Sequence, residues 1–535
     1  MFKILIADSL PEPILKRYNT LKGITIDNRA GISKDELAEV LPEYDGLVVR
    51  SRTKATADLI QRGQKLKVIG RAGAGVDNID TEEATRRGII VMNTPGGNTI
   101  AATEHTIALM LAALRNIPLA NASMRGGKWD RKAYLGNELF EKTVGVVGLG
   151  KIGREVAKRL AAFGVRLIGY DPILTQEVAN RLKIELMGFE DLMKQADIIT
   201  VHVPRMKDTI NMVNAKNLQL CKDGVIIVNC ARGGIINEDD LIAALDSGKV
   251  ATAAVDVYKS EPPEDWRLAE HPKAVATPHL GASTEEAQTK VADQILQQMI
   301  EYFEKDIALN AVNYISVNEK IQPIIAPYFK LARKMGALFS QVREGRLQEV
   351  AIRFYGDIIE LPLEPIAAHL MTGALKARGK SNGGGNVDFI NMVNALAVAR
   401  EKGVEIEISK KRTPLKSRTN LIACDFTTRE GIVHLEGTVY AKDIFRLTAF
   451  GKYDVDADLS RNMIIVENDD VPGIIGGVGT ILANENINIT HVSSGRVIED
   501  KSAVNIFNVE GDYDRGLQDR LRSLSHVRNV QLIEF

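Results

Sequence analysis

The sequence is poor in cysteine and has almost no net charge. Its 535 residues include only three cysteines, Cys221, Cys230 and Cys424, which lie far apart and form no CxxC pair. This argues against a disulfide framework, and no closely spaced ligand set predicts a metal site. The 68 Lys and Arg residues balance 69 Asp and Glu residues. A chain so balanced gives no electrostatic reason to expect nucleic acid or an anionic membrane surface as a partner.

Long apolar runs are missing as well. No uninterrupted run approaches the roughly 20 residues of a membrane span. The opening MFKILIAD predicts a buried strand and not the charged start and apolar core of a secretion signal. We therefore expect a soluble, cytoplasmic protein without a membrane partner. The hydrophobic fraction of 45% suffices for several cores, and the length predicts three or four domains.

Short apolar runs alternate with helical patterns through the first 300 or so residues, which is typical of parallel, doubly wound sheets. Between two series of strands, residues 100–114 predict a helix that is apolar nearly all round and so buried between domains or subunits. A long helix at 285–306 would return the chain to the first domain. The predicted strands are 3–8, 46–50, 67–72 and 88–93 in the first series, and 144–148, 165–171, 197–203, 224–231, 251–258 and 273–279 in the second.

The pattern changes beyond residue 315. Residues 317–455 keep an α/β pattern but contain a glycine-rich loop at 381–388 and a basic run at 410–418. We interpret the basic run as a solvated surface segment, with anion binding as the alternative. Between 461 and 535 the predicted elements follow the order βαββαβ, which predicts a ferredoxin-like sandwich.

The strongest local motif is VGVVGLGKIGREVAKRL at 144–160, which contains GxGxxG directly after a predicted strand. Gly148 allows the tight turn, Gly150 lets the backbone approach a pyrophosphate, and Gly153 permits close packing of the next helix. Asp171 ends the following strand, where a carboxylate can accept both ribose hydroxyls and would repel a 2′-phosphate. The combination predicts NAD, and not NADP, as the cofactor.

Three further predicted strands each end on a charged or titratable residue. Arg232 lies in NCARGG, Glu261 in VDVYKSEPP and His279 in PHLGAS. Taken singly, each has an ordinary explanation as a surface arginine, a loop carboxylate or a capping histidine. Ligands of open α/β sheets lie outside the carboxyl ends of the strands, however, so we expect all three to meet beside the cofactor. A cation, a histidine and a neighbouring carboxylate are the groups that hydride removal from a 2-hydroxy acid requires.

Together these motifs resemble the D-isomer-specific 2-hydroxyacid dehydrogenases. The resemblance rests on GLGKIG, Asp171, NCARGG, the EPP turn and PHLGAS, and it covers about residues 1–315. It implies that Arg232 binds the substrate carboxylate and carbonyl, and that Glu261 supports His279 as the acid–base group. It also implies further cofactor contacts at Lys151, Ile152, Cys230, Ala231, Asp256 and Gly281.

The catalytic trio does not choose among the acids that this family oxidises, because a phosphorylated substrate needs extra cations. Arg50 and Ser51 follow a predicted strand, and Arg131 lies in GGKWDRKAYLG. These segments, with Gly73, resemble members that bind 3-phospho-D-glycerate, where a neighbouring subunit can supply a cation. Ordinary surface charge is an equally open explanation for any one of them. Asn98 could bind substrate or cap the following helix, and the sequence leaves both open.

The last predicted domain resembles an ACT domain, a regulatory module that binds amino acids. The turn DVPG at 470–473 offers backbone donors to a carboxylate, Asp470 could take the ammonium group, and Asn488 could come from the opposing subunit. The resemblance implies L-serine as the effector. It also implies that the region before the ACT domain is an extra regulatory domain that binds substrate or another anion.

The sequence therefore predicts an α/β protein of four domains. We expect a flavodoxin-like substrate-binding domain of residues 1–97 with 285–315 and a Rossmann-type NAD-binding domain of residues 98–284. An α/β intervening regulatory domain of residues 316–455 and a ferredoxin-like ACT domain of residues 460–535 follow. The apolar helix, the shared cation and the ACT domain predict a homodimer or homotetramer.

The resemblance implies the NAD-dependent oxidation of 3-phospho-D-glycerate to 3-phosphohydroxypyruvate, the first step of L-serine biosynthesis, with serine feedback as an open question. Two alternatives remain. A hydroxypyruvate, glyoxylate or 2-oxoglutarate reductase of the same family would act on unphosphorylated acids and be indifferent to Arg50 and Arg131. An NAD-sensing scaffold, like the corepressors that share this fold, would lack the two-domain extension.

Overall fold

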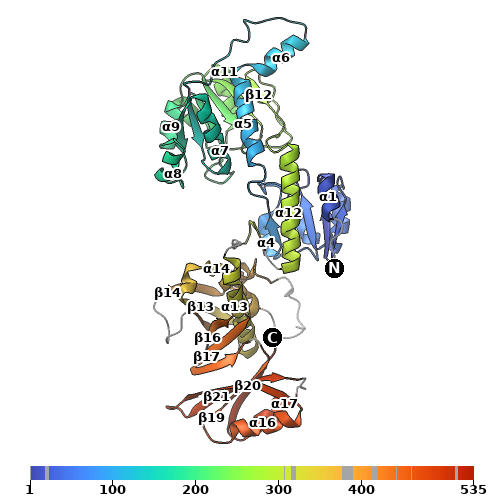
Figure 1. Cartoon of the computed structure of the whole chain (residues 1–535), viewed down its shortest axis with the longest axis vertical. Helices are drawn as coiled ribbons and strands as arrows, with labels where there is room; N and C mark the ends of the chain where they lie inside the picture. The colour runs from blue at the N-terminus through green and yellow to red at the C-terminus, as the bar shows by residue number, and fades with distance from the viewer. Residues whose placement is uncertain are drawn as a thin grey trace.

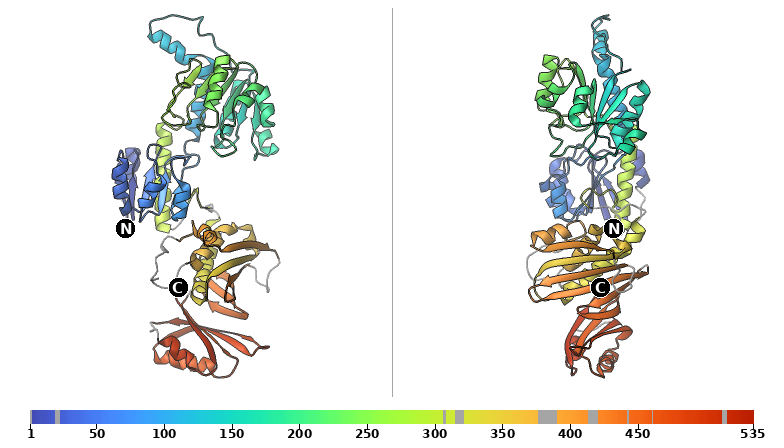
Figure 2. Two further views of the ribbon diagram at one scale, coloured as in Figure 1. Left: turned by 180° about the vertical axis from the view of Figure 1, so that it is seen from behind. Right: turned by 90° about the vertical axis from the view of Figure 1, so that its left-hand side faces the viewer.

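The computed structural model shows four units stacked along the long axis of the molecule (Figure 1). The strands of the described residues form four sheets, of five, seven, six and four strands. The seven-stranded sheet lies at one end, and the five-stranded sheet of the N-terminal residues lies between it and the C-terminal half (Figure 2). The structure describes all residues except 1, 19–22, 306–307, 315–320, 376–389, 413–419, 442, 460 and 512–515, so the predicted glycine-rich loop and most of the basic run lie outside it.

The first sheet is parallel, with the flavodoxin-like order β2-β1-β3-β4-β5. Helices α1 and α12 cover one face, and α2, α3 and α4 cover the other. A Cβ at Gly46 or Gly70 would lie only 2.8 or 2.5 Å from the side chain of Met299, so these glycines admit the returning helix α12. The elements are β1 (Phe2–Ile6), α1 (Glu12–Tyr18), β2 (Ile24–Asn28), α2 (Lys34–Val40), η1 (Leu41–Glu43), β3 (Gly46–Val49), α3 (Ala57–Arg62), β4 (Val68–Arg71), α4 (Thr81–Arg86), β5 (Ile90–Met92) and α12 (Glu285–Lys305).

The second sheet is also parallel, in the order β12-β11-β10-β9-β6-β7-β8. The strand order reverses between β6 and β9, which is where a doubly wound sheet binds a dinucleotide. Its carboxyl ends face the first unit across a cleft. The elements are β6 (Thr143–Val147), α7 (Lys151–Leu160), η2 (Ala161–Phe163), β7 (Arg166–Tyr170), α8 (Gln176–Arg181), β8 (Glu185–Leu186), α9 (Phe189–Gln195), β9 (Ile198–Val201), α10 (Ala215–Leu220), β10 (Val225–Asn229), α11 (Glu238–Ser247), β11 (Val250–Val255) and β12 (Ala274–Ala276).

Helix α5 (Thr99–Leu114) joins the two units and confirms the predicted apolar helix. Its side chains Ile107, Leu109 and Met110 are buried in the core of the seven-stranded sheet. Helix α6 (Ile117–Arg125) follows and carries the chain away from the body of the molecule (Figure 1). Among the described residues no single helix is long and apolar enough to cross a membrane; the bent pair α5 and α6 meets that test only by length and composition.

The third unit pairs a six-stranded sheet, in the order β14-β13-β15-β16-β17-β18, with helices α13 and α14 on one face. Strands β13 and β14 are parallel and the other neighbours are antiparallel. The two helices cross closely, because a Cβ at Gly336 or Gly373 would lie about 2 Å from a backbone oxygen of the other helix. The elements are α13 (Gln322–Val342), β13 (Leu347–Gly356), η3 (Asp357–Glu360), α14 (Leu363–Leu375), α15 (Ala395–Glu401), β14 (Glu405–Lys411), β15 (Asn420–Thr428), β16 (Ile432–Ala441), β17 (Ile444–Phe450) and β18 (Tyr453–Asp458).

The fourth unit has the ferredoxin-like order β20-β21-β19-β22, as the sequence predicts. Helices α16 and α17 cover one face of this sheet. The other face adds Met463, Ile465 and Ile506 to the core of the third unit. The two C-terminal units therefore share one hydrophobic core. The elements are β19 (Met463–Asp469), α16 (Ile474–Asn484), β20 (Asn488–Val497), β21 (Ser502–Glu510), α17 (Leu517–Arg522) and β22 (Val527–Ile533).

A short segment before α15 docks the third unit onto the first. Asn391 donates its side-chain amide to the carbonyl of Gly88 at 2.6 Å, and Asn394 donates to the carbonyl of Arg86 at 3.1 Å. Between them Met392 and Val393 pack against the core around α12. The segment 391–394 thus binds the turn that joins α4 to β5 through hydrogen bonds and apolar packing.

Candidate active site

The glycine-rich turn after β6 has the geometry that its sequence predicts. Gly148 has φ of 90°, and a Cβ at Gly153 would lie 2.0 Å from the carbonyl oxygen of Gly148. Nothing lies within 4 Å of the corresponding position at Gly150, which precedes α7. Asp171 at the end of β7 accepts the backbone N–H of Leu149 at 2.8 Å, which fixes its carboxylate beside the turn. This open turn with a carboxylate at its side suits a dinucleotide that lacks a 2′-phosphate.

The predicted catalytic residues line one cleft between the first two units. The cleft has a volume of about 870 Å³, and both units contribute to its lining. Arg232 follows β10, Glu261 lies in the loop after β11, and His279 follows β12. Because these strands are parallel neighbours in one sheet, their carboxyl ends bring the three residues to the same edge. The sequence argument for a joint site therefore agrees with where the structure places them.

His279 and Glu261 form a hydrogen-bonded pair that faces the cleft. The Nδ1 atom of His279 lies 2.6 Å from Oε2 of Glu261, and the backbone N–H of Tyr258 donates to the other carboxylate oxygen at 3.2 Å. The two side chains are 38% and 37% exposed. A carboxylate at Nδ1 holds the proton there, so Nε2 is the ring atom left to exchange a proton in the cleft.

Arg232 is held between the two units. Its Nε donates to Asp77 at 2.9 Å, and its Nη1 donates to the carbonyl of Ala231 at 2.7 Å. A Cβ at Gly75 would lie 2.1 Å from Nη2, so the loop after β4 approaches the guanidinium as closely as a glycine permits. The contact with Asp77 joins the two units across the cleft.

Arg71, at the end of β4, is a cleft residue that our sequence reasoning missed. Burial and the neighbouring charge of Arg232 lower its pKa to about 10, and its Nε has no hydrogen-bond partner in the described part of the chain. Both guanidinium groups line the cleft, and two positive charges there favour an anionic ligand. The strand-end rule that found Arg232 would also have found Arg71 in KVIGRA.

The predicted cofactor contacts gather at the same edge of the sheet. Asp256 is fully buried and accepts the backbone N–H of Gly281 at 2.9 Å. Cys230 is buried beside Asp256, and burial raises the pKa of its thiol to about 12. Lys151 donates to the carbonyl of Pro95 at 3.2 Å. Ile152 packs against the core beneath, and Ala231 donates its N–H to Asn229.

The remaining predicted residues do not all reach the cleft. Ser51 lines it, whereas the Arg50 guanidinium donates to the carbonyl of Ser9 at 2.9 Å. Arg131 lies in the exposed segment after α6, which extends away from the cleft (Figure 1).

Two further predicted substrate residues are Gly73 and Asn98. Gly73 has φ of 158° and lies against the Arg71 guanidinium. Asn98 occupies the N-cap position of α5, but its side chain makes no cap hydrogen bond, so the capping explanation is wrong.

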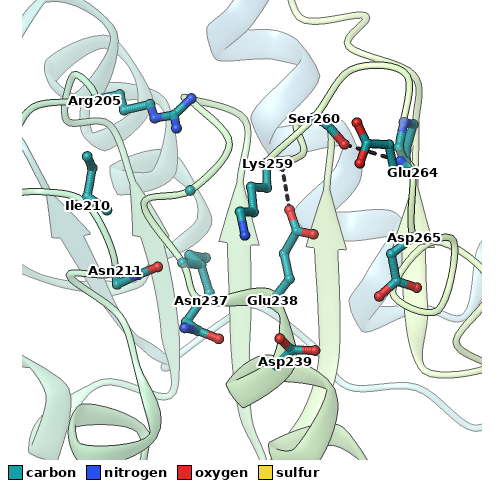
Figure 3. A pocket seen from close by; sticks show the side chains of 13 residues that line it. Arg205, Ile210, Asn211, Asn237, Glu238, Asp239, Lys259, Ser260, Glu264 and Asp265 are labelled. Atoms are coloured by element: carbon teal, nitrogen blue, oxygen red, sulfur yellow. Dashed lines mark hydrogen bonds between the residues drawn. The ribbon is translucent and has the colours of Figure 1, made fainter.

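A second hollow of about 450 Å³ adjoins the cleft and shares Arg205 and Lys259 with it. Figure 3 shows Lys259 next to Glu238, which accepts the backbone N–H of Lys259 at 2.6 Å, and Arg205 across the hollow from Glu264 and Asp265. Asp239, Glu264 and Asp265 also line it, so acids outnumber cations. An anionic ligand is therefore favoured in the cleft and not in this hollow.

The predicted effector residues lie in the fourth unit. Asp470 is exposed in the turn before α16, and its backbone N–H donates to the carbonyl of Lys501 at 2.9 Å. Asn488 is the exposed first residue of β20. Both side chains are open to a ligand.

Three protein-family models match the chain. The NAD-binding domain of the D-isomer specific 2-hydroxyacid dehydrogenases matches residues 107–281. The intervening domain of D-3-phosphoglycerate dehydrogenase matches residues 324–450, and the ACT domain matches residues 462–525. Their order agrees with the second, third and fourth units of the structure.

Relatives named D-3-phosphoglycerate dehydrogenase match over most or all of the chain. The protein of Bacillus subtilis is 38% identical over 99% of this chain and 98% of its own length. That of Methanocaldococcus jannaschii is 36% identical over the whole of both chains. The human protein is 39% identical over 76% of this chain and 75% of its own.

Solved structures match the first two units. A glyoxylate reductase from Paecilomyes thermophila has a TM-score of 0.54 at 30% identity and covers 58% of this chain and 98% of its own. An NAD-dependent formate dehydrogenase from Staphylococcus aureus, solved with NAD, has a TM-score of 0.52 at 30% identity and covers 57% of this chain and 96% of its own. With the cleft, the glycine-rich turn and the full-length relatives, these matches show that the chain belongs to the D-3-phosphoglycerate dehydrogenase family of the D-isomer-specific 2-hydroxyacid dehydrogenases.

Proposed function

We propose that this protein oxidises 3-phospho-D-glycerate to 3-phosphohydroxypyruvate with NAD, the reaction that starts L-serine biosynthesis. The observation that supports it most is the cleft itself. There Arg232 and the His279–Glu261 pair meet at the edge of the sheet that carries the dinucleotide turn. The names of the full-length relatives support the choice of a phosphorylated substrate.

The site residues divide the chemistry between them. When NAD is bound, its nicotinamide accepts the hydride from C2 of the substrate. The guanidinium of Arg232 supplies a fixed positive charge to the substrate carboxylate. The Nε2 atom of His279 takes the proton of the C2 hydroxyl, and Glu261 at Nδ1 compensates the charge of the imidazolium that forms. Arg71 adds a second positive charge at the anion-binding side.

The domain assignment belongs to the same proposal. Residues 1–97 with 285–315 bind substrate, and residues 98–284 bind NAD through Gly148, Gly150, Gly153 and the residues predicted around them. Residues 316–455 and 460–535 regulate the enzyme. In support, the two catalytic units face one cleft, and the two C-terminal units share one core apart from it.

The substrate is tested by NADH formation from 3-phospho-D-glycerate, D-glycerate and D-lactate. We expect kcat/KM to favour the phosphorylated acid by about a hundredfold or more, because charge-assisted hydrogen bonds hold the phosphate. Arg50→Gln and Arg131→Gln should lower activity on the phosphorylated acid and leave that on D-glycerate unchanged. For Arg50 this requires its guanidinium to leave the carbonyl of Ser9 and turn to the phosphate when the substrate binds. Equal activity on D-glycerate would contradict the substrate assignment and favour a reductase of unphosphorylated 2-oxoacids.

We also propose a cytoplasmic homo-oligomer in which Arg131 completes the cleft of a second copy. The segment that carries Arg131 leaves Trp129 77% and Leu135 87% exposed, and Met124 of α6 is 54% exposed. Apolar side chains exposed to this extent favour burial against a partner. Mixing Arg131→Gln with His279→Ala subunits should restore activity, since each hybrid dimer then has one cleft with both groups. No restoration on mixing would contradict the shared site.

Serine feedback through Asp470 and Asn488 is the regulatory part of the proposal. Both residues are exposed at the turn and strand where an ACT domain offers backbone donors. We expect millimolar L-serine to lower the initial rate of the wild-type enzyme and to have no effect on Asp470→Ala. An unchanged wild-type rate would remove the feedback and leave the enzymatic function intact.

A further inference from the structure

The turn that presents His279 is held in an unfavourable backbone conformation. His279 has φ of 54°, in the left-handed region that non-glycine residues rarely adopt. Such a conformation persists only where the surrounding contacts over-determine it. The contacts that hold this turn therefore help to set where the imidazole lies.

The buried carboxylate of Asp256 holds the turn on both sides of His279. Its Oδ1 accepts the N–H of Leu280 at 2.7 Å and the hydroxyl of Thr277 at 2.7 Å, and its Oδ2 accepts the N–H of Gly281 at 2.9 Å. The N–H of His279 donates to the backbone carbonyl of Asp256 at 2.8 Å. One buried residue thus fixes every position from 277 to 281 except Pro278.

His105 is the side chain that reaches this carboxylate from outside the loop. It lies on α5, and its Nε2 is 3.1 Å from Oδ1 of Asp256 and 3.2 Å from the hydroxyl of Thr277. Its side chain is only 19% exposed. Helix α5 links the first two units. The contacts of His105 therefore connect this helix to the turn that carries His279.

We propose that His105 is a positioning residue that orients His279 by fixing the carboxylate of Asp256. The proposal rests on the proposed function, in which His279 exchanges the proton of the substrate hydroxyl. A buried carboxylate needs all of its donors, and it turns toward those that remain when one is lost. Asp256 would then release part of its hold on Leu280 and Gly281, and the turn would relax toward an ordinary φ.

Burial and hydrogen bonding act in opposite directions on Asp256. Burial raises the pKa of its carboxyl, but the hydrogen bonds that it accepts, first among them the one from His105, outweigh burial and keep the pKa below its usual value. The carboxylate is therefore ionised while it holds the turn. Removing His105 takes away the leading contribution on the stabilising side.

The test compares three variants of the full-length enzyme. His105→Leu removes the donor, and His105→Gln keeps a donor near the position of Nε2. His271→Leu is the matched control, because His271 makes a similar contact with Asp246 at 3.2 Å on the far side of the sheet. Thermal unfolding of each variant first establishes that the fold is intact.

We expect His105→Leu to lower kcat by about ten- to a hundredfold, since small misplacements of reacting groups have effects of this size. The primary isotope effect with substrate deuterated at C2 should rise. The Kd for NADH, measured by fluorescence, should rise by a smaller factor than kcat falls, because the Gly148–Gly153 turn is untouched although Asp256 and Gly281 are predicted cofactor contacts. His105→Gln should recover most of kcat, and His271→Leu should match the wild type.

Three outcomes would overturn the proposal: a wild-type kcat in His105→Leu, an equal loss in a folded His105→Gln, or a loss confined to NADH affinity. The failure of the proposed function would look different, because the wild-type enzyme would then be inactive on 3-phospho-D-glycerate. The variants are in that case compared on whichever of D-glycerate and D-lactate the wild type oxidises.

Discussion

The protein contains two histidine–carboxylate pairs of nearly equal length in two of its domains. His279 lies 2.6 Å from Glu261 in the cleft, and His434 lies 2.5 Å from Asp425 on a sheet of the intervening domain. His279 ends a strand at the open edge of a parallel sheet, whereas His434 lies within β16. By their local geometry alone the two pairs could not be told apart.

The two pairs differ in whether one ring nitrogen of the histidine remains available to a substrate. Both ring nitrogens of His434 are engaged, since Nε2 lies 3.3 Å from Glu436, and Arg353 holds Asp425 at 2.6 Å. The hydrogen bonds to Glu436 and Asp425 outweigh burial and raise the pKa of His434 above its usual value. The protonated form of His434 is thus favoured, and both of its ring nitrogens are occupied. A histidine–carboxylate pair becomes an acid–base group only where one nitrogen faces a cavity.

Replacing the histidine of each pair should give the largest difference between the two pairs. His279→Ala should lower kcat by about 10²–10⁴, the usual contribution of a general base. His434→Ala should leave kcat unchanged, because both of its ring nitrogens already face carboxylates. Initial rates of NADH formation measure both. A loss of less than tenfold in folded His279→Ala would make His279 structural.

The arginines beside the two pairs give the next effect. Arg232→Lys should lower kcat/KM by about ten- to a hundredfold, because a lysine cannot reproduce the planar donor set toward a carboxylate. Arg353→Lys keeps its charge near Asp425 and should not change kcat/KM. Steady-state kinetics with varied substrate distinguish them, and equal losses in both variants would indicate a general effect on folding.

The carboxylates give a smaller effect. Glu261→Gln should lower kcat by about tenfold, because the imidazolium loses its counter-charge while the ring stays in place. Asp425→Asn should not alter kcat. Stopped-flow measurement of hydride transfer tests the first variant, and a rate equal to that of the wild type would remove Glu261 from the reaction.

The smallest effect concerns stability and pH. A histidine whose pKa is raised on folding stabilises the protein fully below its unfolded value of about 6.5, and this contribution is lost as pH rises through the folded value. The Tm difference between the wild type and His434→Gln should therefore be about 2–4 °C near pH 5.5 and vanish at alkaline pH. A difference that grew with pH would contradict the assigned protonation.

The parallel sheets were predictable from sequence because each buried strand is a short apolar run next to a helical pattern. The joint site of Arg232, Glu261 and His279 was predictable for the same reason, since strand ends share one edge. Arg71 obeys the same rule, because it is the last residue of β4. The reach of Arg131 could not be predicted, because it depends on where α6 directs the chain. The strand order of the intervening domain could not be predicted either, because its mixed pairing joins residues far apart in sequence.

The grip of residues 391–394 on the α4–β5 turn has a consequence for protein engineering. The first two units are not independent of the residues beyond 315. Such a fragment would expose to water the apolar surface that Met392 and Val393 cover and would lose the donors that Asn391 and Asn394 bring to the turn. Polar replacements on that surface should therefore stabilise a fragment that ends at residue 315.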